Sequence, residues 1–199
     1  MVEKINEGGS KMQKHISTYD AALALFKEFN QSESLLKHAY SVEGVMRYMA
    51  RKMGEDEEKW GIVGLLHDLD YERFPEQHCK KSQEILEERG WLEEYIRAIV
   101  SHGWGICSDV EPQTELEKTL YTVDELTGLI TSVAIIRPSK SVTDLEAKSV
   151  MKKWEDKSFA AGVNRPVIEK GTAMLGVELR DLVTDVIMGM REVTDRIGL

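Results

Sequence analysis

Histidine and aspartate side chains interrupt three apolar helical stretches of this 199-residue chain. Four residues share this placement: His38, His67, Asp68 and Asp124. Burying a polar side chain without a partner costs roughly 2–7 kcal/mol, and burying a charge costs more, so something must satisfy these groups. Neutral imidazole and ionised carboxylate are common ligands of divalent transition metals. We therefore expect the four residues to form one metal site.

A lone residue of this kind has a simpler explanation. A histidine on an apolar stripe is usually hydrogen-bonded within the core, and an aspartate there often caps a helix. The coincidence of four such residues on three separate stripes favours a shared ligand over four unrelated structural roles.

The order of these residues resembles the signature of the HD superfamily of metal-dependent phosphohydrolases, which is a histidine, a His-Asp pair and a distal aspartate. The stretches 64–71 (GLLHDLDY) and 123–128 (VDELTG) resemble its HDIG-type branch. The similarity extends over roughly residues 30–175 and includes 137–140 (RPSK). The resemblance implies an all-α fold, a compact HD-domain helical bundle, in which the four residues bind the metal.

Two further histidines extend the resemblance. His78 and His102 occupy the places of histidines found in two-metal members such as the HD-GYP phosphodiesterases. A site of that kind uses Asp68 as a bridge to a second ion held by His78 and His102. The alternative is one ion, with these two histidines orienting its ligands or contacting substrate.

The activity implied is hydrolysis of a small phosphorylated substrate by metal-activated water. The substrate is a phosphomonoester or phosphodiester, with a nucleotide as one candidate. Asp68 and Asp70 are the candidate catalytic carboxylates. Single-metal nucleotidases of the superfamily carry a catalytic glutamate where this chain has Tyr71, which weakens a direct transfer of their chemistry. Asp70 is equally well explained as a helix-end residue or as a partner of a ligand histidine.

The expected cofactor is one or two divalent ions of Mn, Fe, Co, Ni or Zn, with Mg as a further candidate. Two other functions fit the same residues. Some HD-fold proteins hold a mixed-valent di-iron centre and act as oxygenases, and others could be non-catalytic regulatory domains that bind metal or nucleotide. Arg137 and Lys140, in the densest basic cluster, are candidate phosphate-binding residues, although a solvated helix face explains them as well.

Apolar periodicity predicts a helical chain with no strands and no internal repeat. The helices are expected over 21–29, 35–53, 56–70, 79–89, 92–101, 114–137, 147–154, 164–175 and 177–197. Capping boxes are expected at Thr114 with Glu117 and at Thr143 with Glu146. Asp124 is expected to be buried.

Residues 1–16 are expected to form a flexible arm, and 17–199 a single domain with a metal-binding core over about 33–135 and packing helices over 141–199. The formal charge of −9 argues against nucleic-acid and anionic-membrane partners. Cys79 and Cys107 are expected to be reduced thiols. No signal peptide or membrane span is apparent, so a cytoplasmic monomer or homodimer is expected.

Overall fold

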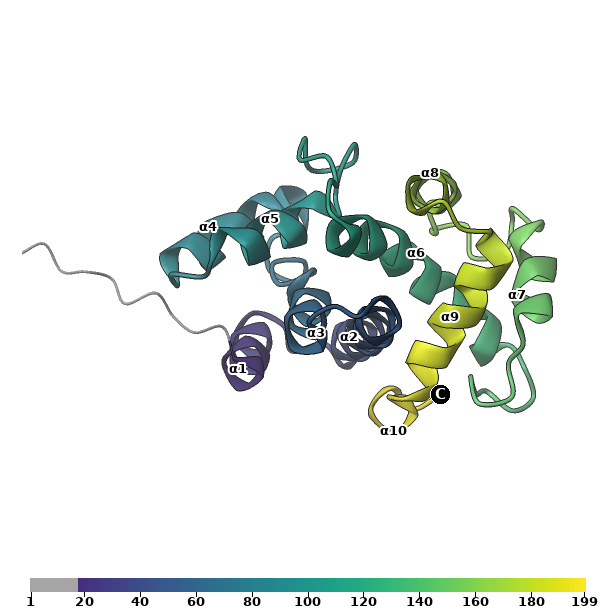
Figure 1. The fold of residues 1–199 in the computed structure, drawn as a ribbon. Coiled ribbons are helices and arrows are strands. Elements are labelled where there is room, and N and C mark those ends of the chain that lie inside the picture. Colours follow the sequence, from purple (N-terminus) through teal and green to yellow (C-terminus); the bar gives the residue numbers. More distant parts are fainter. Residues whose placement is uncertain (1–17) are drawn as a thin grey trace, which may run out of the picture.

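The computed structural model describes residues 18–199, and the predicted arm over 1–16 lies outside them. The described chain is all-α and contains no strand, which confirms the predicted fold class (Figure 1). Its helices are α1 (Tyr19–Phe29), α2 (Glu33–Met53), α3 (Glu57–Leu66), α4 (Lys80–Glu88), α5 (Glu93–Ser101), α6 (Glu115–Ile135), α7 (Ala147–Trp154), α8 (Arg165–Leu175), α9 (Leu179–Arg191) and α10 (Thr194–Ile197), with a 3₁₀ turn over Pro75–Gln77.

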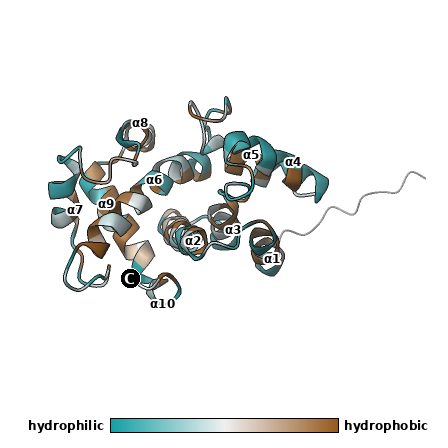
Figure 2. Ribbon diagram, turned by 180° about the vertical axis from the view of Figure 1, so that it is seen from behind, coloured by the Kyte–Doolittle hydropathy of each residue, from teal (hydrophilic) through white to brown (hydrophobic). Residues whose placement is uncertain are grey.

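Helix α2 is the centre of the bundle, since it packs against α3, α6, α9 and α10. Figure 1 shows α1, α3 and α2 side by side, with α4, α5 and α6 crossing them on one side. Helices α7, α8 and α9 gather at the end that α6 reaches. Hydrophilic residues mark the outer edge of α4, as a surface helix requires (Figure 2).

Glycines allow α2 to approach its neighbours closely. A Cβ on Gly64 of α3 would lie 3.0 Å from the Val42 carbonyl oxygen of α2. A Cβ on Gly189 of α9 would lie 2.6 Å from the Val45 Cα atom of α2. Larger residues at either position would force the helices apart.

Helix boundaries follow the sequence signals in part. The Thr114–Glu117 capping box is confirmed, with both of its hydrogen bonds present. The Thr143–Glu146 box is wrong: Glu146 is itself the N-cap of α7 and makes no capping side-chain bond, while the Thr143 hydroxyl bonds to that of Ser141.

Two predicted helices are shorter than expected. The third ends at Leu66 rather than near residue 70, and the chain then turns through residues 67–73. The last is divided into α9 and α10, because the backbone at Val193 leaves the helical region (φ −121°, ψ 16°). This break lets α10 pack against α2.

No helix within residues 18–199 is both long enough and apolar enough to cross a bilayer.

Candidate metal centre and adjoining cavity

The four predicted metal ligands converge on one point. His38 comes from α2, His67 and Asp68 from the turn after α3, and Asp124 from the middle of α6. The His38 Nε2 atom lies 3.0 Å from Asp124 Oδ1 and 3.2 Å from His67 Nε2. His67 Nε2 is also 3.3 Å from one oxygen of each aspartate. Helix α3 ends at Leu66, and His67 and Asp68 begin the turn over residues 67–73.

The His67 ring is held with its Nε2 atom toward the cluster. Its Nδ1 atom lies 2.8 Å from the carbonyl oxygen of Gly64, which can only accept, so the Nδ1 nitrogen carries the proton. In the neutral tautomer the Nε2 lone pair then points at the other ligands. The side chain is fully buried, so its ring has little freedom to turn away.

A second group of nitrogens lies on the other side of Asp68. The Nε2 atoms of His78 and His102 are 3.1 Å apart. Asp68 Oδ1 lies 3.4 Å from His78 Nε2 and 3.8 Å from His102 Nε2, whereas its Oδ2 faces His67. Asp68 therefore presents one oxygen to each pair of histidines, which is the arrangement of a bridging carboxylate.

Asp70 lies behind His78 and does not face the cluster. Its Oδ1 atom accepts a hydrogen bond of 2.7 Å from His78 Nδ1, and its Oδ2 atom accepts one of 2.8 Å from the Ser82 backbone N–H. The residue is completely buried. His102 is oriented in the same way by its own helix, with Nδ1 donating to the Ile99 carbonyl oxygen at 2.5 Å.

The donor set fits a divalent cation. Two ligands about 2.1 Å from one ion and roughly 90–110° apart are separated by about 3.0–3.4 Å, which matches most distances within each group. The inward atoms of His38, His67 and Asp68 could hold an ion, and those of His78 and His102 form a second such group with the Cys79 thiol. Two imidazole nitrogens that face each other form a hydrogen bond only if one of them carries a proton. A cation between them can instead accept the lone pairs of both.

The two carboxylates of this cluster favour positive charge on the neighbouring histidine. Burial lowers the pKa of His67, but the carboxylates of Asp68 and Asp124 outweigh it and raise that pKa well above the usual value. Despite burial, which acts in the opposite direction, the histidine charges lower the pKa of both aspartates. Burial and the charge of His67 lower the pKa of His102 to about 4.

The cluster opens to solvent through a cleft of about 320 Å³. Asp124 was expected to be buried, but its side chain is 21% exposed because it forms part of the cleft wall. Other residues that line the cleft were not predicted as site residues from the sequence: Gly103, Ile106, Cys107, Glu125, Gly128 and Val167. Only Glu125 carried a signal, since it follows a ligand directly on an apolar helix. Burial raises its pKa, and it accepts a hydrogen bond from the Asn164 backbone.

The two cysteines meet beside the second histidine pair. Their Sγ atoms are 3.0 Å apart, with Cys79 buried and Cys107 exposed at the cleft. Gly103 makes this approach possible, because a Cβ there would collide with both sulfur atoms. The sequence did not predict this contact, because the two cysteines are 28 positions apart.

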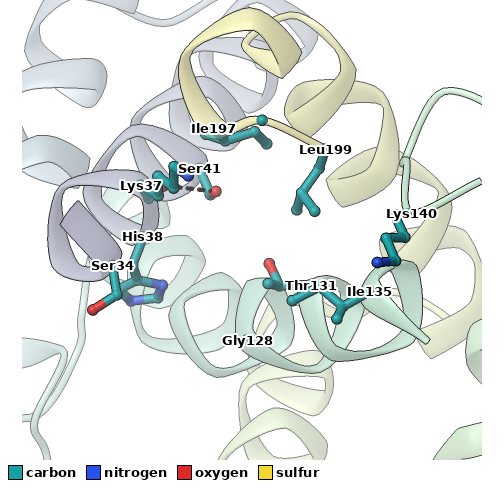
Figure 3. A pocket seen from close by; sticks show the side chains of 11 residues that line it. Ser34, Lys37, His38, Ser41, Gly128, Thr131, Ile135, Lys140, Ile197 and Leu199 are labelled. Atoms are coloured by element: carbon teal, nitrogen blue, oxygen red, sulfur yellow. Dashed lines mark hydrogen bonds between the residues drawn. The ribbon is translucent and has the colours of Figure 1, made fainter.

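A second hollow of about 380 Å³ adjoins the cleft (Figure 3). His38 and Gly128 line both spaces. Lys140 lines this second hollow at the end opposite His38, with its ammonium group directed inward. Arg137 lines neither space and donates instead to the Asp144 carboxylate at 2.8 Å. A phosphate contact for Arg137 thus stays a prediction.

The clustered residues lie within a stretch of the chain that is similar to a known family. Residues 35–129 match the family model described as HD domain, a span that holds all six clustered histidine and aspartate residues. A ribonuclease Y of Oleidesulfovibrio alaskensis is 27% identical over 156 residues, which are 76% of this chain. They are only 27% of that relative, so this chain corresponds to a minor part of its length. No solved structure matches the chain.

Proposed function

We propose that the protein is a metal-dependent hydrolase of a small phosphorylated substrate, on the basis that residues 35–129 match the HD domain family model. The observation that carries the proposal is the position of Asp68 between two histidine pairs. The HD family is generally associated with metal-dependent phosphoester hydrolysis, and the cluster supplies donors for such a metal.

A divalent ion bound there would supply Lewis acidity toward a phosphoryl oxygen and lower the pKa of a coordinated water. The residues of the chain contribute position. His67 and His102 are fixed by backbone carbonyls, and His78 is fixed by Asp70, so three imidazoles keep their Nε2 atoms inward. Fixed ligands avoid the cost of reorganisation when substrate arrives.

The similarity to a ribonuclease supports phosphodiesters as well as phosphomonoesters as substrate candidates. The net charge of −9 favours a small substrate over a long nucleic acid, since a polyanion needs an extended basic face. We therefore propose substrates of nucleotide size, bound locally by the cleft.

The test is removal and return of metal. Treatment with a chelator should abolish hydrolysis of p-nitrophenyl phosphate or bis(p-nitrophenyl) phosphate, and Mn²⁺, Co²⁺, Ni²⁺ or Fe²⁺ should restore it. Asp68→Asn should lower kcat at least about 10²-fold, because an amide cannot bridge two cations. Asp181→Asn makes the same chemical change on an exposed carboxylate of α9 and should have no effect.

Two results would contradict the proposal. One is inactivity toward a broad panel of phosphate esters while metal analysis shows a fully loaded protein. The other is a coupled iron pair seen by spectroscopy together with consumption of oxygen, which would identify an oxygenase.

A further inference from the structure

Gly128 stands in the interior of α6 without a packing reason. Glycine destabilises a helix relative to alanine, so its presence there needs an explanation. Gly128 is half-buried, whereas the five other glycines within the helices of residues 18–199 are buried. Each of these has a packing reason, since a Cβ would meet a neighbouring atom at under 3.0 Å: Gly44, Gly61, Gly64, Gly171 and Gly189. A Cβ on Gly128 would meet only Val163 Cγ2, at an ordinary contact distance of 3.9 Å.

The position of Gly128 supplies the reason. It lies one helical turn after Asp124 and lines both the metal cleft and the second hollow. A long side chain there would project into the space where the two hollows adjoin. The missing side chain leaves room at the wall that the two spaces share.

The second hollow has the character of a site for an organic group. Its walls come from α2, α6 and the C-terminal segment, with apolar contributions from Ile135, Ile197 and Leu199 (Figure 3). The hydroxyl of Thr131 is directed into it. A largely apolar space with a few polar groups is typical of small-molecule sites.

Lys140 gives the far end of this space a positive charge. Among the described residues its ammonium group has no ion-pair or hydrogen-bond partner. Its backbone adopts φ +47°, a left-handed conformation that is unfavourable for a residue with a side chain. Strain of this kind clusters at active sites and at positions that bind ligands.

We propose that the second hollow binds the organic part of the phosphate ester whose phosphoryl group lies at the metal cluster. This inference rests on the proposed function and narrows the substrate class. The organic part is a largely apolar body, of aryl or nucleobase size, that carries an anionic or hydrogen-bond-accepting group at its far end. Gly128 admits it, and Lys140 binds its far end.

Phosphonates test binding without turnover. Calorimetry on the Mn²⁺-loaded protein would compare methylphosphonate, phenylphosphonate and 4-phosphonobenzoate. Phenylphosphonate should bind roughly tenfold more tightly than methylphosphonate, because its ring is buried in the hollow. The carboxylate of 4-phosphonobenzoate should add a further gain of about threefold through Lys140.

Variants assign these gains to residues. Gly128→Leu should bring the ratio of the phenylphosphonate and methylphosphonate dissociation constants close to one. The control is Gly162→Leu, which should leave this ratio unchanged, because Gly162 is exposed and has no atom within 4 Å of its Cβ position. Lys140→Met should remove only the gain in affinity that the carboxylate of 4-phosphonobenzoate provides. Lys157→Met, on the exposed surface, should leave that gain unchanged. Thermal melts and Mn²⁺ titrations of each variant separate these effects from misfolding.

The outcomes distinguish the two proposals. Metal-dependent binding of all three phosphonates with equal affinity would overturn the role of the hollow and leave the phosphohydrolase proposal standing. Failure of every phosphonate to bind the metal-loaded protein would contradict both.

Discussion

His78 donates its Nδ1 proton to Asp70 across 2.7 Å, and this bond turns the Nε2 atom of His78 toward Asp68. This geometry favours a positioning role for Asp70 over a catalytic one, since its second oxygen is bonded to the Ser82 backbone and neither oxygen faces the cleft. The carboxylate also makes the histidine a better ligand, because it stabilises positive charge on the imidazole.

The first prediction concerns Asp70→Asn. The asparagine side chain keeps the shape of Asp70 but loses its charge. Its NH₂ group must now face either the His78 Nδ1–H or the Ser82 backbone N–H, and both of these are donors. Metal affinity should fall by about 10–100-fold, with a matching increase in the metal concentration needed for half-maximal activity. Saturating metal should restore most of kcat, which a purely structural defect would not allow. A metal titration unchanged from the wild type would contradict the assignment.

The second prediction concerns pH. In the metal-free protein, burial lowers the pKa of His67 but Asp68 and Asp124 raise it further, so the net change is upward. Its stabilising contribution is full below the unfolded pKa of about 6.5 and is lost as pH rises through the folded value. Metal must displace that proton, so metal affinity rises with pH over the same range.

The two effects act together on thermal stability. The difference in Tm between Mn²⁺-loaded and chelated protein should be larger at pH 8 than at pH 6. The two aspartates do not change this expectation, because their lowered pKa values keep them ionised at both pH values. An equal difference at both pH values would argue against a proton displaced from the cluster.

The third prediction concerns Cys107. The hydrogen bond from Cys79 and the nearby charge of His78 lower the pKa of Cys107 to about 7, although burial opposes them. In chelated protein its alkylation by iodoacetamide should therefore reach half its maximal rate near pH 7. Cys79→Ala should move that midpoint toward the ordinary thiol value of about 8.5. A wild-type midpoint already at that value would contradict the thiol pair.

The fourth prediction concerns Gly64→Ala. The added methyl group would lie 2.9 Å from Met46 Cγ and 3.0 Å from the Val42 carbonyl oxygen, so α3 must shift away from α2. We expect a loss of about 1–3 kcal/mol in the free energy of unfolding, measured by denaturant titration. Metal affinity should fall as well, because the Gly64 carbonyl orients His67. Gly162→Ala is the control, and equal stability of the two variants would show that the contact is relieved without cost.

Local signals in the sequence predicted most of the helices. The Thr114–Glu117 box was found because its four residues are contiguous, and Gly54 ends α2 in the left-handed conformation that glycine permits. The failures have tertiary causes. Helix α3 ends early where His67 and Asp68 must face one cluster, and the last helix breaks where Val193 packs against Gly44.

The part of the site that depends on residue types could be predicted from the sequence. Histidines and aspartates on apolar stripes identified His38, His67, Asp68 and Asp124, whereas the family resemblance added His78 and His102. The HD match supports that resemblance. The second hollow could not be predicted in this way. Its walls combine residues near positions 38, 128 and 197, and its distinguishing feature at Gly128 is a side chain that is absent.

The contact between His38 and Asp124 joins residues 86 positions apart, and it lies between the two longest helices of the described chain. An ion shared by these side chains would hold the two ends of that loop together in the native chain, and it would stabilise the fold by binding the native state and not the unfolded one. Metal loading would then govern how cooperatively the whole bundle unfolds, and α2 and α6 would separate late, only after the ion has been released.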